Sequence, residues 1–191
     1  MGLTAEQFIE YTALAPVIPA VKDDMGLTAV RQTESRVVFV LYGDILSVPH
    51  IVEELHAMGK TAIVHADLVN GLSSREVAAD FIACNTGADG VISTKPQVIR
   101  RAKELGLFTV QRFFLLDSMA FAGLRTQAVQ TRPDVIEVLP AGLSKVIRII
   151  RREFGRNLIA GGLVLDKEDV IAALSAGAAA VSTTNAALWN L

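Results

Sequence analysis

The chain has 191 residues, of which 51% are hydrophobic, 20% charged and 6% aromatic, and this apolar fraction excludes an intrinsically disordered chain. A net charge of −2 means that nucleic-acid binding would need a local basic patch. Cys84 is the only cysteine, which excludes a disulfide scaffold within the chain.

The mean hydropathy of +0.42 raises the question of a membrane segment. The longest weakly polar stretch, residues 172–180, is far shorter than the roughly 20 apolar residues that a spanning helix needs. Glu6 and Glu10 stand where a signal peptide would carry Lys or Arg. We therefore expect a cytoplasmic protein with an unusually large apolar core and no membrane partner.

Eight short apolar runs recur along the chain, and each is followed by a longer amphipathic stretch. Continuous apolar runs of this length are typical of strands buried on both faces of a parallel sheet. The predicted strands are residues 17–21, 37–42, 62–68, 89–94, 108–115, 134–139, 157–160 and 179–183.

The stretches between these runs carry helix start and stop signals. Pro96 suits a first helical position, and Gly106 suits the position after a helix end. Ser73 followed three residues later by Glu76 predicts a capping box. Asp166 opens an acidic tetrapeptide that favours the start of the last long helix.

Eight alternating strands and helices allow a closed barrel or an open doubly wound sheet. The glycine-rich dinucleotide fingerprint is absent after the first strand, which weakens the open sheet. We therefore predict a compact (β/α)8 TIM-type barrel of the α/β class, a single domain over residues 1–191. Residues 1–15 are expected to form an N-terminal helix that covers the bottom of the barrel.

In such a barrel the functional groups lie where the strands end. Side-chain alternation predicts that His65 and Asp67 both point into the barrel, whereas it leaves Gln111 and Arg112 undecided. His65 can equally be a satisfied core histidine, and Asp67 or Glu137 a helix cap or rim salt bridge. The polar residues at the predicted strand ends are Lys22, Asp44, His65, Asp67, Ser93, Lys95, Gln111, Arg112, Glu137, Gly161, Gly162, Ser182, Thr183, Thr184 and Asn185.

The last two strand ends indicate a phosphate site. Many barrels bind phosphate with the loops after strands seven and eight, through backbone N–H groups and Ser or Thr hydroxyls. Gly161, Gly162, Ser182 and Thr183 stand at these positions, although a tight turn and a strand end would also explain them. Lys95 or Arg112 can add a charged hydrogen bond to the same anion.

Other candidate chemistry is weaker. Cys84 is expected to be a buried small hydrophobic residue rather than a reactive thiol. Oxygen ligands for Mg²⁺ exist, but no spacing signature supports a metal, and none is predicted. The carboxylate and imidazole candidates for such a metal are Asp44, His65, Asp67 and Glu137.

A basic cluster occupies one predicted helix and consists of Lys145, Arg148, Arg151, Arg152 and Arg156. Lys145, Arg148 and Arg152 share a helix face and can follow nucleic-acid phosphates. A plain solvated helix surface explains the same spacing.

Nearly the whole chain resembles the glycerol-3-phosphate-responsive antiterminator family, regulators of bacterial glycerol-uptake operons. The segments that carry the resemblance are Leu41-Tyr-Gly-Asp-Ile45, His65-Ala-Asp-Leu-Val-Asn-Gly-Leu-Ser-Ser74, Gly90-Val-Ile-Ser-Thr-Lys-Pro96, Leu107-Phe-Thr-Val-Gln-Arg112, Ile136-Glu-Val-Leu-Pro140, Ile159-Ala-Gly-Gly-Leu163 and Ala180-Val-Ser-Thr-Thr-Asn185.

The resemblance implies a non-catalytic barrel that binds glycerol 3-phosphate and then acts on a leader mRNA to prevent premature termination. It implies no cofactor, and a homodimer is a further expectation. Phosphate is expected at Gly161, Gly162, Ser182, Thr183, Lys95 and Arg112, the polyol at Asp67, Glu137, His65 and Asp44, and RNA at Lys145, Arg148 and Arg152. The alternative is a barrel enzyme acting on a small phosphorylated polyol or sugar, with Asp67 or Glu137 as general base or Lys95 forming a Schiff base.

Overall fold

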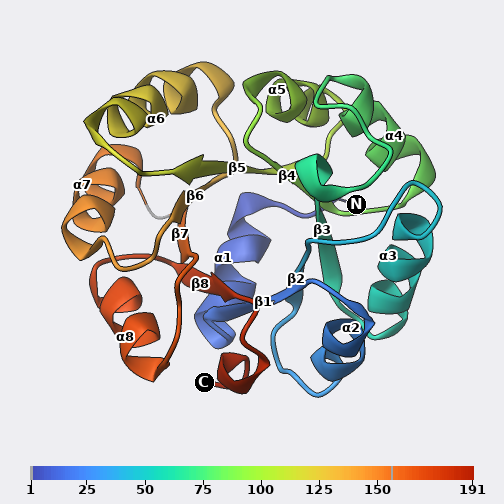
Figure 1. The fold of residues 1–191 in the computed structure, drawn as a ribbon, viewed down its shortest axis with the longest axis horizontal. Coiled ribbons are helices and arrows are strands. Elements are labelled where there is room, and N and C mark those ends of the chain that lie inside the picture. Colours follow the sequence, from blue (N-terminus) through green and yellow to red (C-terminus); the bar gives the residue numbers. More distant parts are fainter. Residues whose placement is uncertain (1, 156) are drawn as a thin grey trace.

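A computed structural model describes residues 2–155 and 157–191 as a closed barrel of eight parallel strands inside a ring of helices (Figure 1). Each strand pairs with the next along the chain, and the last pairs with the first, so the predicted (β/α)8 barrel is confirmed. The strands are β1 Val17–Val21, β2 Val37–Val40, β3 Thr61–His65, β4 Gly90–Ser93, β5 Phe108–Phe114, β6 Val135–Leu139, β7 Leu158–Gly161 and β8 Ala180–Thr183.

The helices fill the connections between the strands, and two short 3₁₀ turns, η1 and η2, follow β3 and β8. None of the described helices combines the length and the apolar character that crossing a membrane requires. The elements are α1 Ala5–Leu14, α2 Asp24–Val30, α3 Val48–Ala57, η1 Ala66–Leu68, α4 Val77–Asn85, α5 Pro96–Glu104, α6 Ser118–Thr131, α7 Ser144–Phe154, α8 Lys167–Ser175 and η2 Ala186–Leu188.

Most helix signals in the sequence are confirmed. Pro96 is the first residue of α5, Gly106 follows that helix with a φ of +79°, and the Asp166 carboxylate accepts from the Asp169 N–H at the start of α8. The capping box at Ser73 and Glu76 is wrong, because α4 begins only at Val77 and no side chain caps it.

The expected burial of Cys84 is also wrong, because this residue is exposed. Helix α4 turns Ala78, Ala79 and Ile82 toward the barrel. Cys84 lies five residues after Ala79, which places it well away from that buried face at 3.6 residues per turn.

Two apolar cores hold the barrel together. The larger one lies between the strands and the surrounding helices, and the smaller one fills the inside of the barrel. Helix α1 crosses the amino-terminal end of the strands (Figure 1), where Phe8 stacks on Phe108 with ring centroids 5.1 Å apart. Because apolar side chains fill this lower end, polar groups inside the barrel are confined to the end where the strands finish.

Candidate functional site

A layer of buried polar side chains lies inside the barrel above the inner apolar core. Parallel register places Arg112 of β5 beside Glu137 of β6, and the Arg112 Nε donates to Glu137 Oε2 at 2.6 Å. The other carboxylate oxygen accepts from the Ser182 hydroxyl at 2.6 Å. Glu137 is fully buried, so both of its oxygens are held by partners that compensate for the loss of water.

The structure decides between Gln111 and Arg112. Arg112 follows Phe108 and Val110 of the inner core at two-residue steps along β5, so it shares their face and points into the barrel. Gln111 faces outward to α6, where its side-chain oxygen accepts from the Thr131 hydroxyl at 2.5 Å. Neither Nη group of Arg112 has a hydrogen-bond partner within the described chain, so both are available to a ligand.

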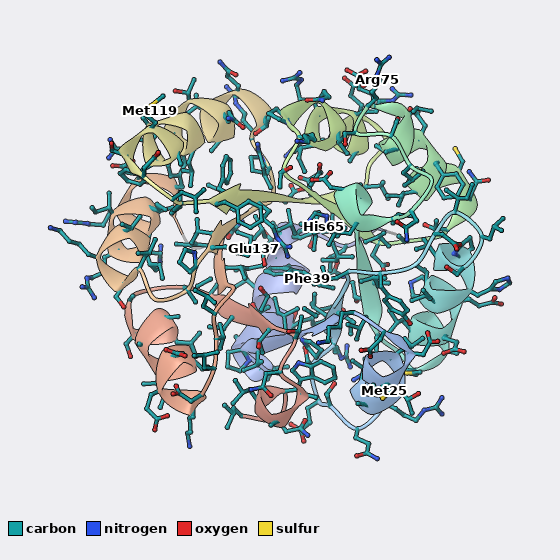
Figure 2. The ribbon with its side chains drawn as sticks, viewed as in Figure 1. Met25, Phe39, His65, Arg75, Met119 and Glu137 are labelled. Carbon is teal, nitrogen blue, oxygen red and sulfur yellow. The ribbon has the colours of Figure 1, made fainter. Side chains whose placement is uncertain are left out.

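His65 belongs to the same inner layer. It follows Ile63 of the inner core by two residues, and Figure 2 shows it with Glu137 near the barrel centre. Burial, and then the nearby Arg112 charge, lower the pKa of His65 to about 4, so the imidazole is neutral at pH 7. Its Nδ1 is buried and, among the described residues, has no hydrogen-bond partner. Such an orphaned polar atom is what a ligand hydroxyl would satisfy.

A cavity of about 380 Å³ opens above this layer, between the loops that follow β7 and β8. Arg112, Gly162, Ser182 and Thr183 all line it, together with apolar side chains from neighbouring loops. The backbone N–H groups of Gly162, Leu163 and Thr184 donate to no other backbone group of the described chain. The residues that line the cavity therefore include backbone N–H groups without a backbone acceptor, hydroxyls and a guanidinium, and these groups together suit an anion.

The glycines of this loop have separate roles. Gly161 points inward, and a Cβ there would collide with the Ser182 hydroxyl. Gly162 has a φ of +71°, and a Cβ there would lie 3.0 Å from a methyl carbon of Leu139. Gly161 is thus needed for close packing, and Gly162 is needed both for close packing and for its backbone conformation.

Asp67 is not part of the cavity lining, and its carboxylate is engaged at the end of β4, so its role at the ligand stays a prediction. Strand β3 ends at His65, and η1 takes the next residues out of the strand alternation. The Asp67 carboxylate instead accepts from Ser93 and Thr94 at the end of β4, at 2.5 to 2.8 Å. Burial opposes ionisation, but these hydrogen bonds hold the pKa of Asp67 below its usual value. Asp67 thereby fixes the β4–α5 loop.

Asp44 and Lys95 also lie apart from the cavity. The Asp44 carboxylate accepts from the Ser47 and Leu46 N–H groups at 2.8 and 2.9 Å, and these bonds lower its pKa and close the turn before α3. Lys95 is exposed at the start of α5. Neither residue is part of the cavity lining.

The structure therefore unites only part of the predicted set. Arg112, Gly162, Ser182 and Thr183 line the cavity, whereas His65, Glu137 and Gly161 are buried beside these residues without lining it. Sequence reasoning missed Leu163 and Leu165, which form an apolar wall of the same cavity; two leucines in a loop were the available signal. Among the described residues, no three His, Cys, Asp or Glu side chains gather as a metal site would require.

Helix α7 belongs to the ring of helices that surrounds the barrel (Figure 1). Ile147 and Ile150 face the core, and Lys145, Arg148 and Arg152 are exposed. None of these three cations forms an ion pair with another described residue. Arg156 lies outside the described residues.

Comparison with known proteins places this chain in a family. A family model described as "Glycerol-3-phosphate responsive antiterminator" matches residues 17–189. The chain belongs to this family. A glycerol uptake operon antiterminator regulatory protein from Listeria monocytogenes shares 31% identity, over 91% of this chain and 94% of its own, with a TM-score of 0.87.

Two further antiterminator-family relatives are similar over nearly their full lengths. The structure of a glycerol uptake operon antiterminator-related protein from Thermotoga maritima is 37% identical over 92% of this chain and 98% of its own, with a TM-score of 0.81. The uncharacterized protein YgcP of Escherichia coli K12 is 42% identical over 92% of each chain. Membership of this regulator family assigns the chain to transcription regulation by antitermination.

Proposed function

We propose that this protein senses glycerol 3-phosphate and, when ligand is bound, binds the leader mRNA of glycerol-uptake genes and prevents premature termination. The observation that carries the proposal is the cavity above Arg112, which offers free backbone N–H groups, hydroxyls and an unshared pair of Nη groups in one place. The family's responsiveness to glycerol 3-phosphate supports this ligand. Such a regulator would act in the cytoplasm, without a cofactor and without catalysis.

In the proposed complex the phosphate lies against Gly162, Ser182 and Thr183. The Arg112 Nη groups approach it from the cavity floor, while Glu137 keeps the guanidinium in place through Nε. His65 lies outside the cavity lining but close to Arg112, so a glycerol hydroxyl that displaces the side chains between them would find the unpaired Nδ1 as its partner. Asp44 and Lys95, which lie outside the cavity lining, are left out of this complex.

The single tryptophan makes ligand binding measurable. Trp189 is the only tryptophan, and its Nε1 donates to the Thr183 carbonyl at 2.9 Å, directly behind the cavity wall. Glycerol 3-phosphate should change Trp189 fluorescence in a saturable way, and glycerol should not. Arg112→Met should abolish the change, whereas Arg100→Met on an exposed position should keep it. No binding by fluorescence or by calorimetry would contradict the proposal.

The RNA side of the proposal rests on α7. Its exposed cations at positions 145, 148 and 152 follow one helix face without carboxylate partners among the described residues, so they can neutralise phosphates. Ligand can strengthen RNA binding only if it binds the RNA-competent state better than the other state.

A further inference from the structure

The mouth of the barrel carries exposed apolar side chains around the polar layer. On β5, Phe114 continues the inward alternation of Arg112 one step further out and is 52% exposed. Leu116 just beyond it is 85% exposed, and Leu163 and Leu165 after β7 are 74% and 72% exposed. Single exposed leucines need no explanation, but several on one face indicate an interaction surface.

These four side chains belong to neighbouring loops that are hydrogen-bonded to one another. The Leu115 N–H donates to the Leu139 carbonyl, and the Ala141 N–H donates to the Gly162 carbonyl, so the loops after β5, β6 and β7 lie side by side. Leu163 has a φ of +54°, a conformation that a leucine rarely adopts, and its side chain nevertheless stays in solvent. We call Phe114, Leu116, Leu163 and Leu165 the mouth surface.

The mouth surface borders the ligand cavity. Leu163 and Leu165 line that cavity. Leu139 lines it too and ends β6, the strand between β5, which ends at Phe114, and β7, which precedes the two leucines. Four side chains of this size and exposure present on the order of 500 Å² of apolar area, as much as the largest patch of an ordinary monomer. Ile45, Leu46 and Leu68 are further exposed apolar side chains, on the segments after β2 and β3 at the same end of the barrel, and a standard interface takes roughly 800 Å² from each partner.

Charge decides what kind of partner fits. The exposed ionisable residues at the starts of α6, α7 and α8, which follow the mouth loops, are three acidic and two basic side chains: Asp117, Lys145, Asp166, Lys167 and Glu168. An RNA would meet carboxylates and leucines there. A second copy carries the same mixture of lysines and carboxylates, so opposite charges can pair across a two-fold contact, and the net charge of only −2 per chain opposes pairing little.

We propose that two copies of this chain pair mouth to mouth through Phe114, Leu116, Leu163 and Leu165, and that this contact closes the ligand cavity. Bound ligand is then shielded from water by the partner, so ligand binding and pairing strengthen each other. The exposed face of α7 stays on the outside of both copies, where RNA can reach it. The link to ligand rests on the proposed function, whereas the pairing itself does not.

The test is sedimentation of the full chain up to about 100 µM, with and without glycerol 3-phosphate. The wild type should form a dimer whose dissociation constant falls at least about fivefold when ligand is added. Leu116→Glu should weaken pairing at least about tenfold. Leu163→Asn should weaken it too, and asparagine tolerates the positive φ of this position, so the backbone is preserved. Leu14→Glu is the matched control, because Leu14 is 77% exposed at the opposite end of the barrel on α1.

A wild type that stays monomeric with and without ligand would overturn the pairing. So would a Leu116→Glu variant with a native circular dichroism spectrum that pairs as tightly as the wild type. If the monomer still binds glycerol 3-phosphate, the sensor proposal stands and the mouth contact fails. A dimer that Leu116→Glu disrupts but that never responds to ligand supports the contact and overturns its coupling to ligand. Calorimetry with glycerol 3-phosphate on that dimer then shows whether the sensor proposal fails as well.

Discussion

Gly161 of β7 and Ser182 of β8 are register partners, and they lie so close that a side chain on Gly161 would overlap the Ser182 hydroxyl. The same Cβ would stand 3.1 Å from Glu137 Oε1. Ser182 can donate to Glu137 only because residue 161 has no side chain. The glycine is therefore part of the buried chain of hydrogen bonds that ends at Arg112.

Gly161→Ala should lower the free energy of unfolding by roughly 1 to 3 kcal/mol, as overpacking of a core does. It should also weaken glycerol 3-phosphate binding, because Ser182 has to leave Glu137. Urea denaturation and calorimetry measure the two effects. The control is Gly123→Ala in α6, where the nearest atom, Gln127 Nε2, is 3.8 Å away and alanine favours the helix. Equal stability of the two variants would contradict this packing role.

Arg112 and Glu137 should behave as one unit. Arg112→Met leaves a fully buried carboxylate without its charged partner, so we expect it to lose about 3 to 5 kcal/mol of stability. Adding Glu137→Gln to Arg112→Met removes that buried charge and should restore part of the loss. A double-mutant cycle by urea denaturation measures the coupling. Strictly additive losses would show that the two side chains do not depend on each other.

His65 should make stability depend on pH. Its pKa is lowered from 6.5 to about 4 by burial and by Arg112, so the unfolded chain binds more protons between these values. Stability should therefore be lost as the pH falls through this window, by roughly 2 kcal/mol between pH 7 and pH 5. Urea denaturation at both pH values tests this expectation, and His65→Gln should flatten the difference. An unchanged difference in the variant would mean that other groups cause it.

The barrel could be predicted from the sequence because the strands are buried on both faces and therefore appear as short, mainly apolar runs at even spacing. Helix starts that are set by local chemistry, such as Pro96 in α5 and Asp166 before α8, could also be predicted. The start of α4 could not be predicted in this way, because the loop after η1 continues past Ser73 and the helix begins only at Val77.

The site was predicted less completely, for two physical reasons. Alternation fails where a strand ends, and β3 ends at His65, two residues before Asp67. Alternation also gives no answer for a strand that is covered by an apolar core on each side. For this reason the sequence did not show which of Gln111 and Arg112 faces into the barrel. The deciding fact is the register of β5 with β6, which places Arg112 beside Glu137, and no local pattern encodes it.

The basic face of α7 gives a prediction about RNA. Arg148→Glu with Arg152→Glu should weaken leader-mRNA binding and reduce its dependence on salt, because fewer counterions are released. Filter binding at several salt concentrations measures both effects. Arg31→Glu with Arg75→Glu makes the same charge change at exposed positions on other elements and should have a much smaller effect. Equal losses in the two double variants would point to net charge rather than to α7.

The affinity of the protein for leader mRNA, measured at fixed salt with and without saturating glycerol 3-phosphate, tests the sensor most directly. Ligand should tighten binding by between about 5- and 150-fold, the usual range of coupling between two sites. Arg112→Met should show no such response. The same RNA affinity with and without glycerol 3-phosphate in the wild type would contradict the account.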